Sequence, residues 1–459
     1  MRTKSLHLIA VLLCAMSIGA YAVNPTGTLP VVYMNTNSGN PITDKENYVP
    51  GTVYIDPLST GYTALGSSEA PLTAQLKGRG NWTWNGFAKK PYKIKFDAKQ
   101  KVLGLPKNKH WVLLAGADDC LGGLKNPAGF MLSHAIGLRW TPTIIPVELM
   151  LNGQYQGLYF LTEHVRIDKN RVNIQEQNDG CTASDSITGG WLVEIDNYWS
   201  ENNIEFDEGN GQHIMVSLRE PEILSTPQRQ YLEQQIYAMN DVLYGHSEEQ
   251  LVQLFDIREA AKYYLVQEIM EDCESYHGSC MLYKDRDSLG VTDPWKFGPV
   301  WDFGNAYNRH EERWIYDSPV FEQYWIGQLA SWSVFQQALE EEWWVFRHQL
   351  KDLVRADILA FANRIEQAAK RDAEVWRGTE NYCDNSNFAD VRDRFFRRFD
   401  WRTNWLYEQL GEGIEPSAER IETSNERLEG DTRKILRNGQ LLIIRNDKTY
   451  TIQGQVIEN

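Results

Sequence analysis

Basic residues are scarce in this chain, which has 46 Lys and Arg against 62 Asp and Glu. The amino-terminal stretch MRTKSLHLIAVLLCAMSIGAYA holds two of the basic residues and none of the acidic ones. Without it, 44 basic residues face 62 acidic ones, a formal net charge of −18. Nucleic acids and anionic membranes attract proteins through clustered Lys and Arg. The composition therefore predicts no nucleic-acid partner.

The patterns typical of zinc sites and disulfide scaffolds are also missing. Beyond residue 22 there are five cysteines, Cys120, Cys181, Cys273, Cys280 and Cys383, and no C-x-x-C pair. This spacing indicates neither a zinc ribbon nor a dense disulfide framework, although it leaves room for one bridge in an oxidising compartment. The nine histidines include no H-E-x-x-H motif, which disfavours a metallopeptidase.

Long apolar runs are confined to the amino terminus. Arg2 and Lys4 precede an apolar run from Leu6 to Ile18, and Ala20-Tyr21-Ala22 has the small-x-small pattern of a cleavage site. The run is shorter than the roughly 20 residues that a membrane span needs. We therefore expect residues 1–22 to be a signal peptide and the mature protein to be secreted, to the periplasm, cell surface or extracellular space, without an integral membrane span.

The first half of the chain has mostly strand-like segments. Two apolar runs flank Asn152-Gly153, a strong hairpin signal, across residues 147–165. One helix is expected over residues 123–138. Other short apolar runs are bounded by Gly, Asn and Pro and predict strands over residues 29–36, 51–56, 72–80 and 90–97.

The second half has helical patterns. Thr226-Pro227 offers an N-cap followed by proline at the first helical position, and Asp256 begins a second helix over residues 257–272. Aromatic helices are expected from residue 332 to 410. The sequence thus predicts an α+β fold with a β-rich amino-terminal lobe and a helical carboxy-terminal lobe.

Beyond the main domain, predicted over residues 23–410, the composition changes. Residues 411–433 are polar and acidic without a buried face, which indicates a linker. Residues 434–459 predict a small β tail, with turn signals at Asn438-Gly439 and Asn446-Asp447.

Separated blocks of sequence resemble one family. These blocks are LKGRGNWTW…KKPYKIKFD, HWVLLAGADD, VELMLNGQYQGLYFLTEHVRID, GGWLVEID and FGPVWDFG. In this order they resemble the CotH kinase family, the spore-coat-protein-H-like atypical protein kinases, from about Leu29 to Trp343. The resemblance implies a protein-kinase-like two-lobed fold. It also implies transfer of phosphate from ATP, with Mg²⁺ or Mn²⁺, to Ser or Thr hydroxyls of a protein substrate.

The KGRGN segment is the candidate phosphate loop. Gly78 and Gly80 allow backbone amides to approach phosphate oxygens, and Arg79 adds a fork of donors. A G-x-G pair is also common in ordinary turns, and an exposed salt bridge is the alternative role of Arg79.

A phosphate-pairing lysine should project from the next strand. Lys89, Lys90, Lys93 and Lys95 crowd its start, and pleating places Lys93 and Lys95 on one face. The resemblance points to Lys90 as the nucleotide-contacting lysine, with Lys95 second.

Acidic residues of neighbouring strands are further candidates. The resemblance pairs Glu163 with the lysine and the phosphates, while the alternative is a surface acid near Arg166. Glu194 and Asp196 in WLVEID could serve metal, nucleotide or an internal salt bridge.

The catalytic loop is expected in EIMEDCESYHGSCMLYKD. Kinases space the catalytic Asp and a metal-binding Asn five residues apart, and here Glu274 and Ser279 have that spacing. The family usually shows Asn-x-Asp where this chain has Asp272-Cys273-Glu274. The extra methylene of Glu274 moves its carboxylate by about 1 Å, an error that costs on the order of 100-fold in rate, so Asp272 is the alternative base.

Asp302 in WDFG is the candidate metal ligand, with Ser279 beside it. The family's usual second Asp is Gly304 here. Cys273 and Cys280 flank the loop, either as a local bridge or as core thiols.

The departures from the family pattern at the catalytic loop and at Gly304 leave a catalytically weak pseudokinase, acting in surface assembly, as an alternative function. A carbohydrate-active protein is a third, because the 16 Trp would suit sugar stacking.

Overall fold

The computed structural model describes residues 23–459 except 197–203, 208–212, 246, 289, 318–323, 417–431, 438–439, 446–447, 452–455 and 458–459. The expected signal peptide and most of the expected linker lie outside the described residues. Within the described part, no helix combines the length and apolarity that crossing a membrane requires.

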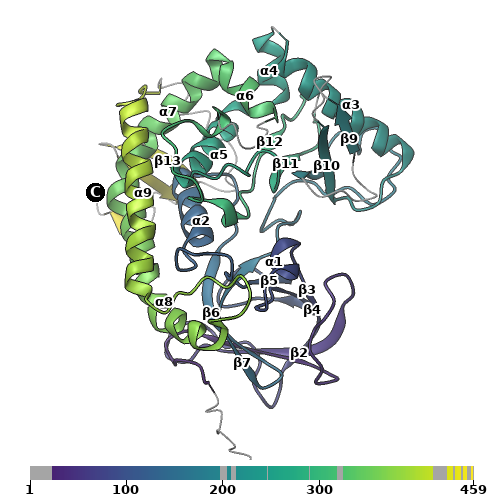
Figure 1. Cartoon of the computed structure of the whole chain (residues 1–459). Helices are drawn as coiled ribbons and strands as arrows, with labels where there is room; N and C mark the ends of the chain where they lie inside the picture. Colours follow the sequence, from purple (N-terminus) through teal and green to yellow (C-terminus); the bar gives the residue numbers. More distant parts are fainter. Residues whose placement is uncertain are drawn as a thin grey trace, which may run out of the picture.

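A closed barrel of seven strands occupies the lower part of Figure 1. Neighbouring strands are antiparallel except β1 and β6, whose parallel pairing closes the barrel. In barrel order the strands are β1 (Val31–Thr36), β2 (Val49–Asp56), β3 (Leu72–Gly78), β4 (Tyr92–Gln100), β5 (Asn108–Leu114), β7 (Gln154–Glu163) and β6 (Ile144–Leu151). The predicted hairpin about Asn152-Gly153 is the β6–β7 pair.

Alternation along β4 explains how the barrel is filled. Tyr92, Ile94 and Phe96 are buried in a core made by the barrel strands, whereas Lys93 and Lys95 point the other way. This is the period of two expected for a strand with one apolar face. The predicted pairing of the two lysines on one face is confirmed.

A second sheet combines strands from both halves of the chain, and the sequence analysis did not predict that these strands pair. This sheet has the order β12 (Lys296–Phe297), β11 (Cys280–Lys284), β8 (Trp191–Asp196), β10 (His213–Glu220) and β9 (Ile204–Asp207). The helices are α1 (Trp82–Asn85), α2 (Lys125–Ile136), α3 (Thr226–Leu243), α4 (Glu248–Leu254), α5 (Ile257–Met270), α6 (Tyr324–Ser331), α7 (Ser333–Gln349), α8 (Arg355–Trp376) and α9 (Phe388–Leu410). Short turns are η1 (Phe303–Asn305), η2 (Ile315–Asp317) and the π-helical η3 (Leu350–Val354).

The helix starts follow local signals. Asp256 accepts a hydrogen bond from the Glu259 amide at the start of α5, as predicted. Helix α3 is capped one residue earlier than predicted, because Ser225 and Gln228 form a reciprocal capping box.

One buried ion pair fixes the barrel against α8. Lys89 Nζ lies 2.8 Å from Asp372 Oδ1 and also donates to the backbone oxygens of Ala115 and Leu158. Asp372 in turn accepts from the Leu158 amide of β7. In Figure 1, α8 accordingly runs from the helical part to the barrel.

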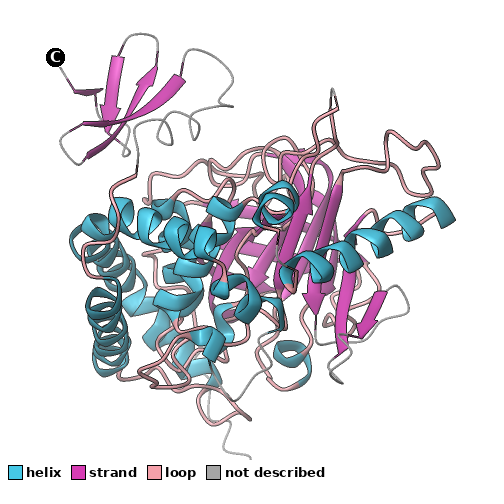
Figure 2. Cartoon of the chain, turned by 90° about the horizontal axis from the view of Figure 1, so that it is seen from above, coloured by secondary structure: helices cyan, strands magenta, loops and turns pink. Residues whose placement is uncertain are grey.

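The carboxy-terminal segment forms a separate four-stranded sheet of β13 (Thr432–Arg437), β14 (Gln440–Arg445), β15 (Lys448–Thr451) and β16 (Val456–Ile457). Figure 2 shows this sheet beside the main body. The two predicted turns lie outside the described residues. The α+β class, with a β-rich amino-terminal region followed by helices, is confirmed, and the closed barrel is an addition that the sequence did not predict.

Candidate functional site

A cleft of about 1050 Å³ separates the barrel from the helical part. One wall is the segment after β3 together with the outward face of β4, and the other is the second sheet with residues 301–308. Five of the eight predicted site residues line it: Arg79, Lys95, Glu274, Ser279 and Asp302. Lys90, Glu163 and Asp272 are not among the lining residues.

Arg79 reaches across the cleft from the barrel side. Its guanidinium carbon lies 5.4 Å from the centre of the Trp301 ring. Burial lowers the pKa of Arg79, while the negative charges of Asp302 and Glu194 act against that shift. Gly80 beside it has a φ of 82°, a conformation that glycine adopts without strain. The loop therefore presents a cation directly to the acidic wall.

Lys93 and Lys95 carry the positive charge of the β4 wall. Burial, together with the neighbouring positive charges of Lys77 and Arg166, lowers the pKa of Lys93 to about 8. Lys95 Nζ is 5.8 Å from the Tyr48 ring centre. These two ammonium groups face the space in which an anion could bind.

Lys90, the first choice from the sequence, points elsewhere. Its Nζ donates to the backbone oxygen of Trp84 at 2.5 Å and lies 5.5 Å from that indole ring. It precedes β4, so the alternation of the strand does not set its direction. The structure thus places Lys93 rather than Lys90 in the cleft.

Glu163 lies inside the protein and not in the cleft. It is 3% exposed, accepts a hydrogen bond from the Thr143 amide at 3.1 Å, and lies 4.0 Å from Arg171 Nε. It is therefore neither beside the cleft lysines nor a surface acid near Arg166. Arg166 pairs instead with Glu220 at 3.3 Å.

Glu194 and Asp196 form the internal salt bridge that was one of their three interpretations. Both project from β8 into the cleft wall and both contact Arg219 of β10, Asp196 at 3.4 Å. Burial raises the pKa of Glu194 in spite of the Arg219 charge.

Glu274 and Ser279 both reach the cleft from the segment between α5 and β11. The side-chain amide of Asn305 donates to Glu274 Oε2. Ser279 has a φ of 54°, an uncommon conformation for a residue other than glycine. The five-residue spacing predicted for the catalytic loop thus places both side chains at one site.

Asp272 is buried below the same loop. It is 1% exposed, and neither carboxylate oxygen accepts a hydrogen bond of normal geometry from a described residue. Burial, with the nearby negative charges of Glu274 and Asp302, raises its pKa well above the usual value. Burial thus disfavours the ionised form of this carboxyl group.

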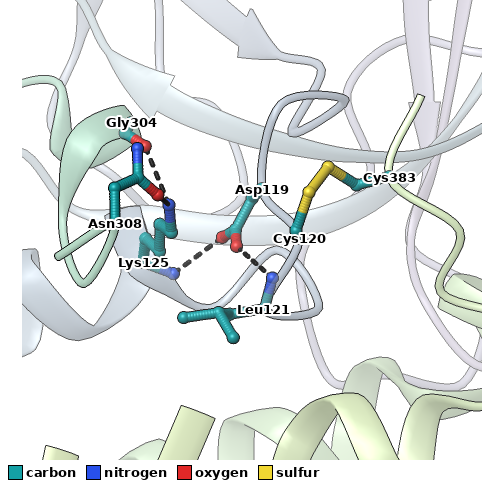
Figure 3. The surroundings of a disulfide bond; sticks show 7 residues. All are labelled: Asp119, Cys120, Leu121, Lys125, Gly304, Asn308 and Cys383. Atoms are coloured by element: carbon teal, nitrogen blue, oxygen red, sulfur yellow. Dashed lines mark hydrogen bonds between the residues drawn. A yellow bond between two sulfur atoms is a disulfide. The ribbon is translucent and has the colours of Figure 1, made fainter. Parts of the chain in front are cut away.

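Asp302 is exposed in the cleft, directly before a segment that hydrogen bonds hold against α2. Its φ of 58° is left-handed. The next residues are fixed by α2: the Phe303 amide donates to Asn126 Oδ1 at 3.1 Å, and Lys125 Nζ donates to the Gly304 oxygen at 2.8 Å. Figure 3 shows this lysine between Gly304 and Asn308.

Asp118 is a cleft residue that the sequence analysis did not select. An ideal Cβ on Gly304 would lie 3.1 Å from Asp118 Oδ2 and 3.3 Å from Asp302 Oδ1, so the two carboxylates flank this glycine. Burial and the Asp302 charge raise the pKa of Asp118 to about 6. The AGADD block contained this residue, but nothing in its local pattern indicates that it faces residue 302.

Residues 76–406 match the family model described as CotH kinase protein. The chain belongs to the CotH kinase family. None of the curated proteins compared with the chain matches it.

A CotH kinase would be expected to use ATP and a divalent cation. Among the described residues, no three His, Cys, Asp or Glu side chains stand close enough to hold a metal ion on their own. Mg²⁺ is commonly held by one or two carboxylates together with substrate phosphates and water. The exposed carboxylate of Asp302 and the nearby oxygen donors of the cleft fit that mode.

A disulfide lies at the edge of this CotH kinase cleft. Cys120, two residues after Asp118, is bonded to Cys383 of the α8–α9 segment (Figure 3). Asp119, the residue before Cys120, accepts hydrogen bonds from the amides of Leu121 and Lys125. Cys273 and Cys280 are buried and form no disulfide, so the local bridge considered for them is absent.

Proposed function

We propose that this protein is a secreted, metal-dependent kinase that transfers the γ-phosphate of ATP to Ser or Thr hydroxyls of a protein substrate. The observation that carries the proposal is the division of one cleft into a cationic barrel wall and an acidic wall with Asp302. Phosphoryl transfer depends mainly on positioning and charge neutralisation, which such a cleft can supply. The barrel and the helical part would then correspond to the two lobes of a protein kinase.

The nucleotide phosphates would lie between Arg79, Lys93 and Lys95. Arg79 offers forked donors suited to phosphate oxygens, and the two lysines add point charges. Asp302, with the Ser279 hydroxyl nearby, would hold the cation. When bound, Mg²⁺ or Mn²⁺ would neutralise charge on the transferred phosphoryl group.

Glu274 is better suited than Asp272 to accept the proton of the acceptor hydroxyl. Glu274 lines the cleft, where a substrate can reach it. Asp272 is buried and its raised pKa favours the protonated form. The bond from Asn305 would hold the Glu274 carboxylate in place.

Secretion is part of the proposal. The apolar stretch at the amino terminus supports it, and so does the Cys120–Cys383 disulfide, because such bridges form and persist in oxidising compartments.

Phosphotransfer from γ-labelled ATP to the protein itself and to a mixed Ser/Thr peptide library tests the reaction. We expect label on serine or threonine that requires Mg²⁺ or Mn²⁺ and is lost in Asp302→Ala. Binding of nucleotide without any transfer would instead support the non-catalytic assembly role.

A further inference from the structure

Gly304 lies between two carboxylates that come from distant parts of the sequence. Asp118 follows β5, and Asp302 precedes η1. An ideal Cβ on Gly304 would lie 3.1 Å from an oxygen of the first and 3.3 Å from an oxygen of the second. The absent side chain therefore leaves the two carboxylates facing one space at the cleft surface.

Neither carboxylate is neutralised by a direct ion pair. Among the described residues, Asp118 and Asp302 have no Lys or Arg nitrogen within 4.0 Å. The nearby Lys125 donates to the Gly304 oxygen and to Asn308 Oδ1, each at 2.8 Å. Arg79 and Lys125 act on these charges from beyond ion-pair distance. The Asp302 charge still repels that of Asp118, and a divalent cation between the two carboxylates would remove that repulsion.

We propose that Asp118 supplies the second metal-binding carboxylate of this kinase, in place of the side chain that residue 304 lacks. The inference rests on the proposed function and names a ligand for its metal. A side chain at 304 would enter the space that the two carboxylates face, so an acid from position 304 and an acid from position 118 are alternative ways to complete the site.

The backbone around Asp118 is fixed well enough for a metal ligand. Asp119 is buried and caps the next turn through the Leu121 and Lys125 amides, both at 2.8 Å. Cys120 is tied to Cys383. Ligands on such a fixed segment bind a cation with little loss of conformational freedom.

The test is Mn²⁺ binding to the full chain, followed by electron paramagnetic resonance, with and without a non-hydrolysable ATP analogue. We expect Asp118→Asn to weaken Mn²⁺ binding on the order of tenfold, because the site loses one carboxylate. Gly304→Ala should weaken it too, because the added methyl group crowds both carboxylates. Gly304→Asp in the Asp118→Asn background should recover binding.

Two matched controls separate the site from general effects. Glu222→Gln removes a carboxylate from the same cleft near Lys93, and Gly327→Ala adds a methyl group where nothing lies within 4 Å. Both should bind Mn²⁺ as the wild type does. Thermal unfolding without metal adds a second readout: Asp118→Asn should be at least as stable as the wild type, since one of two repelling charges is gone.

Unchanged Mn²⁺ affinity in Asp118→Asn, with loss in Asp302→Ala, would overturn the role of Asp118 and leave the kinase proposal standing. Wild-type protein that binds no Mn²⁺ even with the nucleotide would overturn the kinase proposal itself. If Asp118→Asn fails to fold, unchanged binding in Gly304→Ala would overturn the inference.

Discussion

At the residue scale, the charge state of Lys93 should control nucleotide affinity. Its pKa is lowered to about 8 by burial and by the charges of Lys77 and Arg166. The ammonium that would contact phosphate is therefore lost as the pH rises through 8, and bound phosphate would shift that loss to higher pH. We expect ATP affinity, measured by calorimetry, to fall on the order of tenfold between about pH 7 and about pH 9.5.

Three variants test whether Lys93 causes this pH dependence of ATP affinity. Lys93→Arg should bind ATP with an affinity that no longer changes with pH, because guanidinium keeps its proton. Lys93→Met should bind weakly at every pH. Lys90→Met should behave as the wild type, since Lys90 contacts Trp84 and not the cleft. A strong loss of ATP affinity in Lys90→Met alone would restore the sequence-based choice.

Glu274 should matter for transfer and little for binding. Glu274→Gln removes the proton acceptor and should slow single-turnover transfer on the order of 100-fold, while the ATP dissociation constant stays within about threefold. Glu274→Asp should keep or raise the rate, because it restores the carboxylate that is usual in the family. If Glu274→Asp instead lost about 100-fold, or about 2.7 kcal/mol, the site would be tuned to glutamate.

At the scale of elements, the barrel and α8 depend on one buried ion pair. Lys89→Met leaves the Asp372 carboxylate without its cation in the protein interior. We expect a loss of about 3–5 kcal/mol in the free energy of unfolding, measured with urea. Lys90→Met is the neighbouring substitution, at a lysine that forms no ion pair with any residue that the structure describes, and should cost less than about 1 kcal/mol. Equal costs would show that the Lys89–Asp372 pair does not hold these elements together.

The disulfide ties the segment before α2 to the segment before α9. It closes a loop with a sequence separation of 263 residues. We expect Cys383→Ser to lower the free energy of unfolding by about 2–5 kcal/mol. Cys181→Ser, which removes a free thiol, is the control and should change stability little. A wild type whose unfolding is insensitive to reducing agent would contradict this role.

Helix caps and hairpin turns were predicted correctly from a few neighbouring residues. The Asp256 cap and the Asn152-Gly153 turn are examples, since each acts within a few residues. The barrel closure could not be predicted in this way, because β1 and β6 are far apart in sequence and pair in parallel. Strand β11 lies within the segment that the sequence predicted to be the catalytic loop.

The site was predictable in its outline and not in its details. The family blocks contain Arg79 and Asp302, and the five-residue kinase spacing pointed to Glu274; all three line the cleft. The blocks did not show that Lys90 precedes the strand and turns to Trp84. They also could not reveal that Asp118 faces Asp302 across Gly304, which depends on the packing of two loops.

At the scale of the whole molecule, the barrel wall of the cleft carries charge opposite in sign to the net charge of the chain. The chain has a formal net charge of −16, yet Lys77, Lys93 and Lys95 gather on the barrel wall of one cleft. A phosphate-bearing ligand is repelled by the bulk of such a protein and attracted only where these cations cluster. The cation bound at the opposite wall would extend that attraction.

The central claim is that this cleft binds ATP through a divalent cation held by Asp302. Thermal unfolding of the mature protein with ATP, in Mg²⁺ and in EDTA, tests it most directly. With ATP at about 100 times its dissociation constant, binding should stabilise the fold by about 2.7 kcal/mol in Mg²⁺, and far less in EDTA or in Asp302→Ala. Equal stabilisation with and without the cation, or in wild type and Asp302→Ala alike, would contradict the claim.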